Sequence, residues 1–363
     1  MIKAVIIGFA HMHVNEVALY LKNESDIQLV ACADIKPEIK ELTKTRYTRK
    51  WNIENVRDNY CANIYEDYVE MLDREKPEIA FILTETCKKT EVVRECAARG
   101  ISVSIEKPMA MTFDEAEKIY SLVKENGIFA MVNWPLTWRP YLHTMKNALD
   151  MGVIGDLVKI RFLIGNTGPV GKGAIHRGVS EAAEEMTDEQ KSKMWWYNKG
   201  CGGGALLDFL CYGCMFSSWM TEKNADSVIA SAGNYATGFA DIYDNAAAIV
   251  KYDTSMAVLE GTWTTPSRAI PAGPVLYGKD GVLFCEKENG VPLVRACDIY
   301  GNDIEVPNTD YPCFMQNVAT QYAHFRKTGE NVHKTLSLEF NMQVMKLLDS
   351  VRCSAECGRE IKL

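Results

Sequence analysis

The sequence predicts an α/β protein of two domains, a doubly wound parallel sheet followed by an α+β domain with a large open, mostly antiparallel sheet. At 363 residues the chain is longer than one hydrophobic core usually serves. Within residues 1–132, short apolar runs alternate with segments whose apolar side chains recur at helical spacing. Beyond Trp219, alternating strand patterns follow one another across tight turns. We therefore expect domains at residues 1–132 and 133–363.

Composition and charge exclude several classes of protein. Hydrophobic residues make up 47% of the chain and charged residues 24%, as in an ordinary globular protein. The net charge of −8 argues against a nucleic-acid partner and a basic membrane-docking face, and no apolar run is long enough to span a bilayer. The first residues read as a strand and carry no small-residue cleavage site, so we expect no cleavable leader. We expect a cytoplasmic protein with no membrane partner.

The twelve cysteines are scattered, and the nearest pairs are Cys211-x-x-Cys214 and Cys353-x3-Cys357. A zinc site needs four clustered ligands, and neither pair has a second pair of matching spacing. We therefore expect free cysteines that act as small buried hydrophobic residues in a reducing compartment.

The first strand–helix–strand unit has the pattern of a dinucleotide-binding (Rossmann) fold. A buried strand at Ile2–Ile7 leads into a turn at residues 8–13, a helix follows, and the next apolar run, 27–33, ends at Asp34. In such a unit the helix N-terminus binds a pyrophosphate and the acid binds the adenosine ribose. The pattern is imperfect, because Ala10 and His13 stand where glycines are usual, so a helix start in another α/β fold stays the alternative. The turn residues predicted to contact the cofactor are Gly8, Phe9, Ala10, His11 and Met12.

Asp34 also favours NAD over NADP, because its carboxylate would repel a 2′-phosphate. We expect Lys36 to be the only nearby cation. His11 and His13 invite a metal hypothesis, but no third ligand is apparent nearby, so we expect contacts to cofactor or core and no metal.

Later strands of the first domain end in polar residues at the same predicted sheet edge. The apolar run 79–83 ends at Thr84 and Glu85, and the run 101–105 ends at Glu106-Lys107-Pro108. Ligands of open α/β sheets bind where the strands end, so Thr84, Glu85 and Glu106 are predicted cofactor neighbours. Lys107 is placed there to donate a hydrogen bond or a proton to a substrate oxygen.

Several segments together resemble the glucose–fructose oxidoreductase / inositol dehydrogenase (Gfo/Idh/MocA) family, and they cover essentially the whole chain. They are Glu70-Met71-Leu72 with Lys76-Pro77-Glu78-Ile79, Glu106-Lys107-Pro108-Met109-Ala110, Gly152-Val153-Ile154-Gly155-Asp156-Leu157, Gly202-Gly203-Gly204-Ala205-Leu206-Leu207-Asp208, and Ser354-Ala355-Glu356-Cys357-Gly358-Arg359.

The resemblance implies NAD(P)-dependent oxidation or reduction of a sugar, a polyol or a similar hydroxyl compound. It also implies a catalytic lysine, an aspartate, and a histidine four residues after that aspartate. In this sequence these positions are Lys107, Asp208 and Tyr212, so a tyrosine stands in place of the histidine. That departure resembles the glucose–fructose oxidoreductase branch.

The chemistry of these three residues supports the same catalytic roles independently of the resemblance. Hydride leaves a carbinol carbon only if a positioned base takes the hydroxyl proton. Asp208 and Tyr212 are four apart, on one helix face. A phenol titrates near pH ~10, so Tyr212 needs a cation such as Lys107 to act as a base. We interpret Tyr212 as the immediate acid/base, with Lys107 as the close second.

Structural roles for the same residues are the alternatives. Asp208 could cap the helix that follows it, a common role of aspartate. Tyr212 could be a core aromatic residue among Phe209, Phe216 and Trp219.

Sugar contacts are predicted where aromatic faces and hydrogen-bond donors leave the first domain. Trp134 and Arg139 lie in such a segment, although either would also suit packing at the domain junction. A strand at 161–165 delivers Asn166, and the loop after it carries His176. This loop, which runs to Trp195-Trp196-Tyr197, is long enough for a lid or an oligomer arm.

The second domain should build its sheet mainly from residues 227–296, with closing helices at 314–325 and 337–353. The resemblance implies that the open sheet pairs with other subunits, in a homo-oligomer between a dimer and a hexamer.

The sequence thus predicts an NAD-dependent oxidoreductase that acts on a sugar or glycoside ring hydroxyl, possibly giving a keto-glycoside. The alternatives are a hydrolase or lyase that retains NAD and oxidises the sugar transiently, and a non-catalytic NAD-binding regulator.

Overall fold

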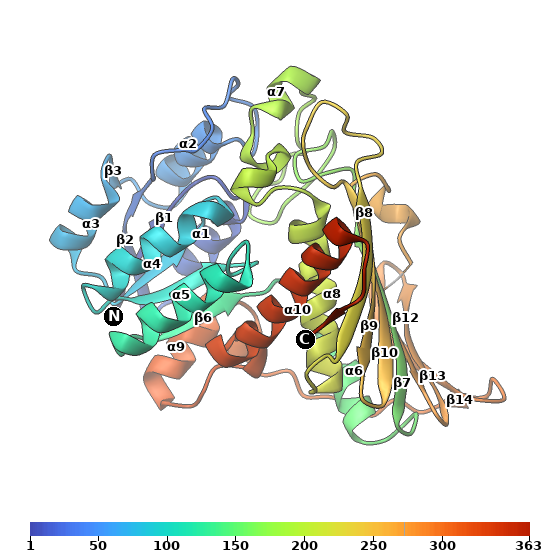
Figure 1. Ribbon diagram of the computed structural model, residues 1–363. Coiled ribbons are helices and arrows are strands. Elements are labelled where there is room, and N and C mark those ends of the chain that lie inside the picture. Colours follow the sequence, from blue (N-terminus) through green and yellow to red (C-terminus); the bar gives the residue numbers. More distant parts are fainter. Residues whose placement is uncertain (272) are drawn as a thin grey trace.

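A computed structural model describes residues 1–271 and 273–363. It contains two sheets, one in each predicted domain, with helices between them (Figure 1). The predicted fold class, a parallel α/β domain followed by a domain with a large, mostly antiparallel sheet, is confirmed.

The first sheet is parallel throughout, with strand order β3-β2-β1-β4-β5-β6. The order reverses between β1 and β4, and in such sheets ligands bind outside the carboxyl ends of the strands at that point. The strands are β1 (Ile2–Ile7), β2 (Ile27–Ala33), β3 (Ile64–Tyr65), β4 (Ile79–Ile82), β5 (Ser102–Glu106) and β6 (Ala130–Asn133).

Amphipathic helices cover both faces of this sheet, and local signals set their ends. Asp67 caps α3 by accepting hydrogen bonds from the N–H groups of Val69 and Glu70, and Thr112 caps α5 through the N–H of Glu115. The helices are α1 (His13–Asn23), α2 (Arg49–Asn59), α3 (Tyr68–Glu75), α4 (Lys89–Ala97) and α5 (Phe113–Glu125).

The second sheet has the order β14-β13-β12-β11-β7-β10-β9-β8-β15. Only the central pair β7–β10 is parallel, and the other neighbours are antiparallel. The strands are β7 (Leu157–Gly165), β8 (Ser227–Gly233), β9 (Asn245–Tyr252), β10 (Ser255–Thr262), β11 (Val275–Gly278), β12 (Gly281–Glu288), β13 (Val291–Asp298), β14 (Asp303–Ile304) and β15 (Ile361–Lys362).

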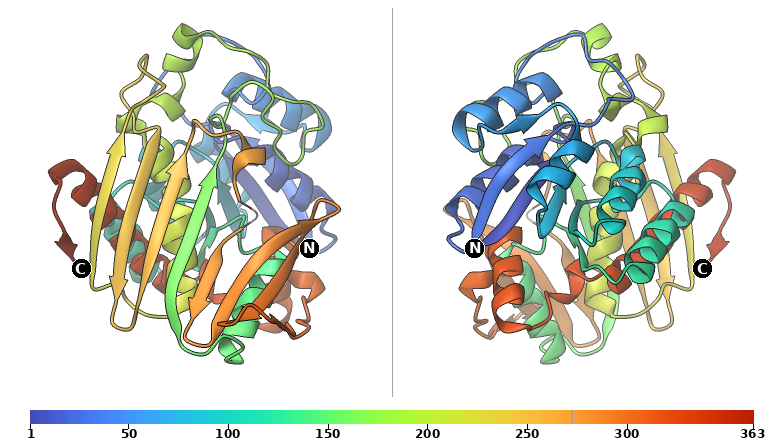
Figure 2. Two further views of the ribbon diagram at one scale, coloured as in Figure 1. Left: turned by 90° about the vertical axis from the view of Figure 1, so that its right-hand side faces the viewer. Right: turned by 90° about the vertical axis from the view of Figure 1, so that its left-hand side faces the viewer.

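In the described part of the chain, the α-helices that pack against the second sheet lie on one of its faces. These are α6 (Pro140–Asp150), α8 (Cys211–Thr221) and α10 (Leu338–Cys357), and the opposite face is open in the left view of Figure 2. Along β9 the residues alternate between buried and exposed, so Ile249 points to the open side.

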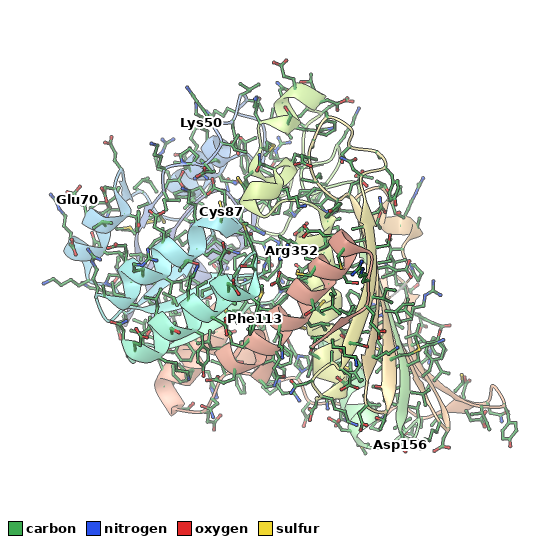
Figure 3. All side chains as sticks on the ribbon, in the orientation of Figure 1. Lys50, Glu70, Cys87, Phe113, Asp156 and Arg352 are labelled. Atoms are coloured by element: carbon green, nitrogen blue, oxygen red, sulfur yellow. The ribbon has the colours of Figure 1, made fainter. Side chains whose placement is uncertain are left out.

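The closing helices tie the two domains together. Helix α9 (Val318–Thr328) packs against α1, and its Val318 and Tyr322 lie in one core cluster with β1 and β4. Helix α10 contacts both α5 and α8, and Figure 3 shows Phe113 of α5 near Arg352 of α10. The backbone N–H of Phe113 donates to the Asp349 carboxylate at 3.1 Å. The predicted boundary at 132/133 falls inside β6.

All twelve cysteines are free, and seven are buried: Cys32, Cys61, Cys96, Cys201, Cys211, Cys214 and Cys285. Among the described helices, none has the length and apolar character needed to cross a membrane.

Candidate active site

The turn between β1 and α1 is tight because Gly8 has a left-handed backbone, with φ of +95°. A Cβ atom at this position would lie 2.5 Å from Cγ2 and 2.7 Å from the backbone nitrogen of Thr84. The next N–H, that of Phe9, donates to Oδ1 of Asp34 at 3.2 Å. Turn and acid therefore meet where the sequence pattern predicts.

Arg49 joins this acid to the end of β4. Its guanidinium pairs with Oδ1 of Asp34 at 2.5 Å and also with the Glu85 carboxylate, and its side chain is only 8% exposed. The interpretation of Lys36 as the only nearby cation was therefore wrong. Arg49 lies fifteen residues beyond Asp34, and folding of the intervening segment brings it back to the sheet edge.

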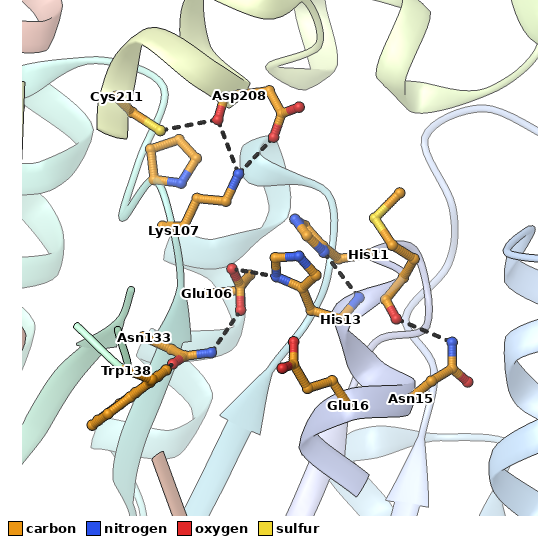
Figure 4. A network of polar contacts seen from close by, with 12 residues as sticks. His11, His13, Asn15, Glu16, Glu106, Lys107, Asn133, Trp138, Asp208 and Cys211 are labelled. Carbon is orange, nitrogen blue, oxygen red and sulfur yellow. Dashed lines mark hydrogen bonds and ion pairs between the residues drawn. The ribbon is translucent and has the colours of Figure 1, made fainter. Parts of the chain in front are cut away.

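Lys107 and Asp208 form a buried ion pair between the two domains. The Lys107 ammonium lies 2.5 Å from Oδ1 and 3.0 Å from the backbone oxygen of Asp208 (Figure 4). The indole N–H of Trp263 donates to Oδ2 of Asp208 at 3.2 Å. Burial alone would lower the pKa of Lys107, but the Asp208 carboxylate holds that pKa well above its ordinary value. Lys107 is therefore charged at neutral pH.

Asp208 does not cap a helix. It lies inside the π-helical turn η4 (Leu206–Leu210), which runs directly into α8, and its carboxylate contacts Lys107 and Trp263. Single π-helical turns of this kind are frequent at functional sites.

Tyr212 lies beside this pair, with the Lys107 nitrogen 4.5 Å from the centre of its ring. The Trp134 ring packs against the same tyrosine, edge to face, at 5.8 Å. Burial raises the pKa of the Tyr212 phenol well above its ordinary value, and Lys107 offsets this only in part. In this arrangement the phenol stays protonated and can donate a hydrogen bond.

Beside Lys107 lies a second polar network. Oε1 of Glu106 is 3.0 Å from Nδ1 of His13, and Oε2 accepts a hydrogen bond from the Asn133 amide at 3.0 Å (Figure 4). Trp138 fixes Asn133 in turn by donating to its Oδ1 at 3.0 Å. The expectation that His11 and His13 have no third potential metal ligand was wrong, because Glu106 lies within 4.8 Å of both.

Lys89 holds the chain on either side of Lys107. Its buried ammonium donates to the backbone oxygens of Glu106 and Pro108, each at 2.7 Å. Burial lowers the pKa of Lys89 to about 7. Sequence reasoning missed Lys89, Arg49 and Asn133, because no motif marks them and only the fold shows their contacts.

The loop between β7 and η4 (residues 166–205), called the lid below for its position, covers the β1–α1 turn. The Trp195 indole donates to the backbone oxygen of Ala10 at 2.9 Å. The Tyr47 hydroxyl donates to the backbone oxygen of Glu181 at 2.8 Å and accepts from the N–H of His176 at 3.2 Å. The turn residues 8–12 are therefore buried.

The predicted substrate residues lie in different environments. Trp134 is buried, donates to Oδ1 of Asn341 at 2.7 Å and supports Tyr212. Arg139 is exposed at the start of α6, and no described polar contact joins it to Lys107, Asp208 or Tyr212. Asn166 accepts from the N–H of Gly168 at 2.8 Å. His176 lies beside His13, with ring centroids 6.4 Å apart.

The residues around the turn fit a dinucleotide. Five buried side-chain atoms in the described chain have no hydrogen-bond partner, and they lie on the turn, at the end of β4, on the lid and on residues 45–46, where Arg46 donates to the Ala182 oxygen of the lid. Buried polar atoms without partners are rare in folded proteins, so their concentration here indicates a polar ligand. They are Nε2 of His11, Oγ1 of Thr45, Nε of Arg46, Oε2 of Glu85 and Nε1 of Trp196.

Comparison with known families agrees with this geometry. Residues 2–134 match the model of the Gfo/Idh/MocA oxidoreductase family with an NAD-binding Rossmann fold, and residues 142–284 match the GFO/IDH/MocA C-terminal domain. Among curated relatives, a dTDP-3,4-didehydro-2,6-dideoxy-alpha-D-glucose 3-reductase of Actinomadura kijaniata is 23% identical over 52% of this chain and 54% of its own length. A mouse trans-1,2-dihydrobenzene-1,2-diol dehydrogenase is 23% identical over 61% of this chain and 59% of its own. The matches thus span little more than half of these relatives.

Solved structures match over the whole chain at low identity and show the shared fold. An aldose-aldose oxidoreductase of Caulobacter crescentus, complexed with glycerol, has a TM-score of 0.75 and 15% identity, covering 100% of this chain and 99% of its own. The WlbA dehydrogenase of Bordetella pertussis, in complex with NADH and UDP-GlcNAcA, has a TM-score of 0.74 and 15% identity, covering 100% and 98%.

The lid should loosen in mild acid because of His176. Burial and the neighbouring His13 lower the pKa of His176 to about 4, and its Nε2 lies 2.6 Å from the Pro169 oxygen. The pKa of His176 is lower in the folded state than its unfolded value of ~6.5. The folded protein therefore keeps its full stability above pH ~6.5 and loses the contribution of neutral His176 as the pH falls toward 4. Thermal unfolding at pH 7 and pH 5 should show a smaller loss of Tm in His176→Gln, which keeps a donor to Pro169 but does not titrate. An equal loss in both proteins would contradict this assignment.

Proposed function

Because this chain belongs to the Gfo/Idh/MocA family of oxidoreductases, we propose that it is an NAD-dependent enzyme that oxidises or reduces a ring hydroxyl of a sugar or glycoside. The observation that carries this proposal is the cluster of Lys107, Asp208 and Tyr212, assembled from both domains beside the β1–α1 turn. The names of the relatives, a sugar reductase and a cyclic diol dehydrogenase, support a ring hydroxyl as the reacting group.

The turn at Gly8, the carboxylates of Asp34 and Glu85 and the turn amides would hold the dinucleotide. When bound, the nicotinamide supplies or accepts the hydride. NAD is favoured over NADP, because Arg49 is already shared between Asp34 and Glu85. One guanidinium between two carboxylates leaves a net negative charge, which disfavours a 2′-phosphate.

Lys107 is the group that moves the proton, and Tyr212 holds the substrate oxygen by a hydrogen bond. Its raised pKa keeps the buried phenol protonated and so rarely available as a base, whereas the charged Lys107 can pass a proton to the Asp208 carboxylate that it touches. During oxidation, Lys107 takes the hydroxyl proton as it passes one of its own to Asp208. During reduction the proton transfer runs in reverse, and Tyr212 donates a hydrogen bond to the carbonyl oxygen.

The favoured substrate is a glycoside whose ring hydroxyl becomes a ketone. His176 and Asn166, on the lid side, are the proposed sugar contacts. Trp134 acts differently, because its indole N–H is bonded to Asn341 and its ring edge supports Tyr212.

Substitutions in the cluster should separate the two proton-transfer roles. Lys107→Met should lower kcat by about 100-fold or more, since general acid–base groups contribute about 10²–10⁴-fold. Tyr212→Phe should lower kcat/KM by about 10- to 100-fold, the effect of one lost hydrogen bond to substrate. Steady-state rates with a panel of sugars and glycosides, read by NADH absorbance, measure both. A larger loss in Tyr212→Phe than in Lys107→Met would make the tyrosine the acid/base instead.

The same panel distinguishes the alternative functions. A dehydrogenase accumulates or consumes NADH in step with product, whereas a hydrolase that retains NAD forms product with no net change in absorbance. A regulator binds NADH and shows no turnover with any compound in the panel.

The open face of the second sheet is the proposed contact of a homo-oligomer. Ile229, Ile249 and Val258 are cross-strand partners on β8, β9 and β10, and Ile229 and Ile249 are 47% and 41% exposed. A row of apolar side chains on a sheet face without helices is typical of a protein–protein contact.

Ile249→Glu should convert the oligomer to smaller species, because it buries a charge at the contact. Light scattering during size-exclusion chromatography measures the mass. Leu42→Glu, at a residue that is 56% exposed in the first domain, is the matched control and should leave the mass unchanged. A monomeric wild-type protein would contradict the assignment of this face.

A further inference from the structure

Two N–H groups are buried without an acceptor where the lid meets the β1–α1 turn. They are Nε2 of His11 on the turn and Nε1 of Trp196 on the lid, and both residues are 2% exposed. Their ring centroids are 4.8 Å apart, with the rings edge to face. A buried donor that has lost water without gaining an acceptor is costly, so two such donors on adjoining rings point to a ligand-binding position.

The tautomer of His11 follows from its other nitrogen. Nδ1 accepts a hydrogen bond from the backbone N–H of His13 at 3.2 Å. Burial lowers the pKa of His11 well below 6.5, so the ring is neutral. A neutral imidazole whose Nδ1 lone pair is occupied carries its proton on Nε2. Nε2 is therefore a donor, and it has no acceptor in the described part of the chain.

This tautomer disfavours the metal site that His11, His13 and Glu106 might otherwise form. A metal on Nε2 would require the proton to sit on Nδ1, where the His13 amide already donates. The buried ammonium groups of Lys89 and Lys107 lie at the same sheet edge, and a divalent cation beside them would be repelled.

Trp195, which directly precedes Trp196, has a structural role. Its indole N–H donates to the Ala10 oxygen at 2.9 Å and thereby fastens the lid to the turn. The Trp196 indole packs against Trp195, with ring centroids 3.8 Å apart, but its own N–H has no partner. The two tryptophans therefore differ in whether the indole N–H has a hydrogen-bond partner, and substitutions can test this difference.

We propose that His11 and Trp196 form a pair of hydrogen-bond donors that binds one oxygen atom of the bound reactants between turn and lid. The acceptor is an oxygen of either the cofactor or the sugar. This inference rests on the proposed function, because it assigns the ligand atom to that reaction. Since His11 lies on the turn and Trp196 on the lid, the ligand oxygen would join the first domain to the second by hydrogen bonds.

Matched variants separate ligand binding from folding. Trp196→Phe and Trp195→Phe remove the same atoms from adjacent rings, and His11→Met removes a donor that His11→Gln retains at similar reach. The measurements are the Tm of the ligand-free protein, the Kd of NADH by calorimetric titration, and kcat/KM for the sugar at saturating cofactor. We expect Trp195→Phe to lower the Tm more than Trp196→Phe does.

Ligand binding should show the opposite order. Trp196→Phe and His11→Met should each weaken the affected constant, the NADH Kd or kcat/KM, by about 10- to 100-fold, the effect of leaving one hydrogen bond unmade. His11→Gln should keep that constant close to the wild-type value. The loss appears in the NADH Kd if the oxygen belongs to the cofactor. It appears in kcat/KM with an unchanged Kd if the oxygen belongs to the sugar.

Three results would overturn the inference: ligand constants of Trp196→Phe and His11→Met equal to wild type, equal ligand losses in Trp195→Phe and Trp196→Phe, or a stoichiometric divalent metal that His11→Met loses. If no sugar is turned over, the proposed function fails by itself. The NADH titration then decides the inference alone, and an unchanged Kd overturns it.

Discussion

The structure depends on one buried ion pair, between Lys107 at the end of β5 and Asp208 in the π turn before α8. The two residues are 101 positions apart and belong to different domains, yet their atoms meet at 2.5 Å with almost no exposure. Two charges removed from water in this way are tolerated only with close geometry and further hydrogen bonds, which Trp263 and the Asp208 backbone oxygen provide. The pair therefore fixes how the domains meet and places the groups that handle the proton.

The other polar contacts of the site support this pair. Lys89 holds the backbone on both sides of Lys107, and Asn133 orients Glu106. The lid covers the turn through Trp195, and the unpartnered buried atoms lie on the turn, at the end of β4, on the lid and on residues 45–46. A closed polar site of this kind strengthens each electrostatic contact with a bound ligand, because water no longer competes.

The fold could be predicted because its signals are local. Apolar runs and helical spacing mark the strands and helices, and Asp67 and Thr112 mark helix starts. Lys107, Asp208 and Tyr212 could be named because they stand in motifs of a recognisable family. Arg49 could not be predicted as the partner of Asp34, nor Glu106 as the partner of His13, 93 residues away. Such contacts join different elements, and no local pattern encodes them.

The most direct test of this account is a double-mutant cycle between Lys107→Met and Asp208→Leu on the free energy of unfolding, measured by denaturant titration. Each single substitution leaves a buried charge unpaired and should cost about 3–5 kcal/mol. The double variant should cost less than the sum of the two by at least about 2 kcal/mol, because it buries no unpaired charge. Costs that add within about 0.5 kcal/mol would show that the two residues do not act as a pair.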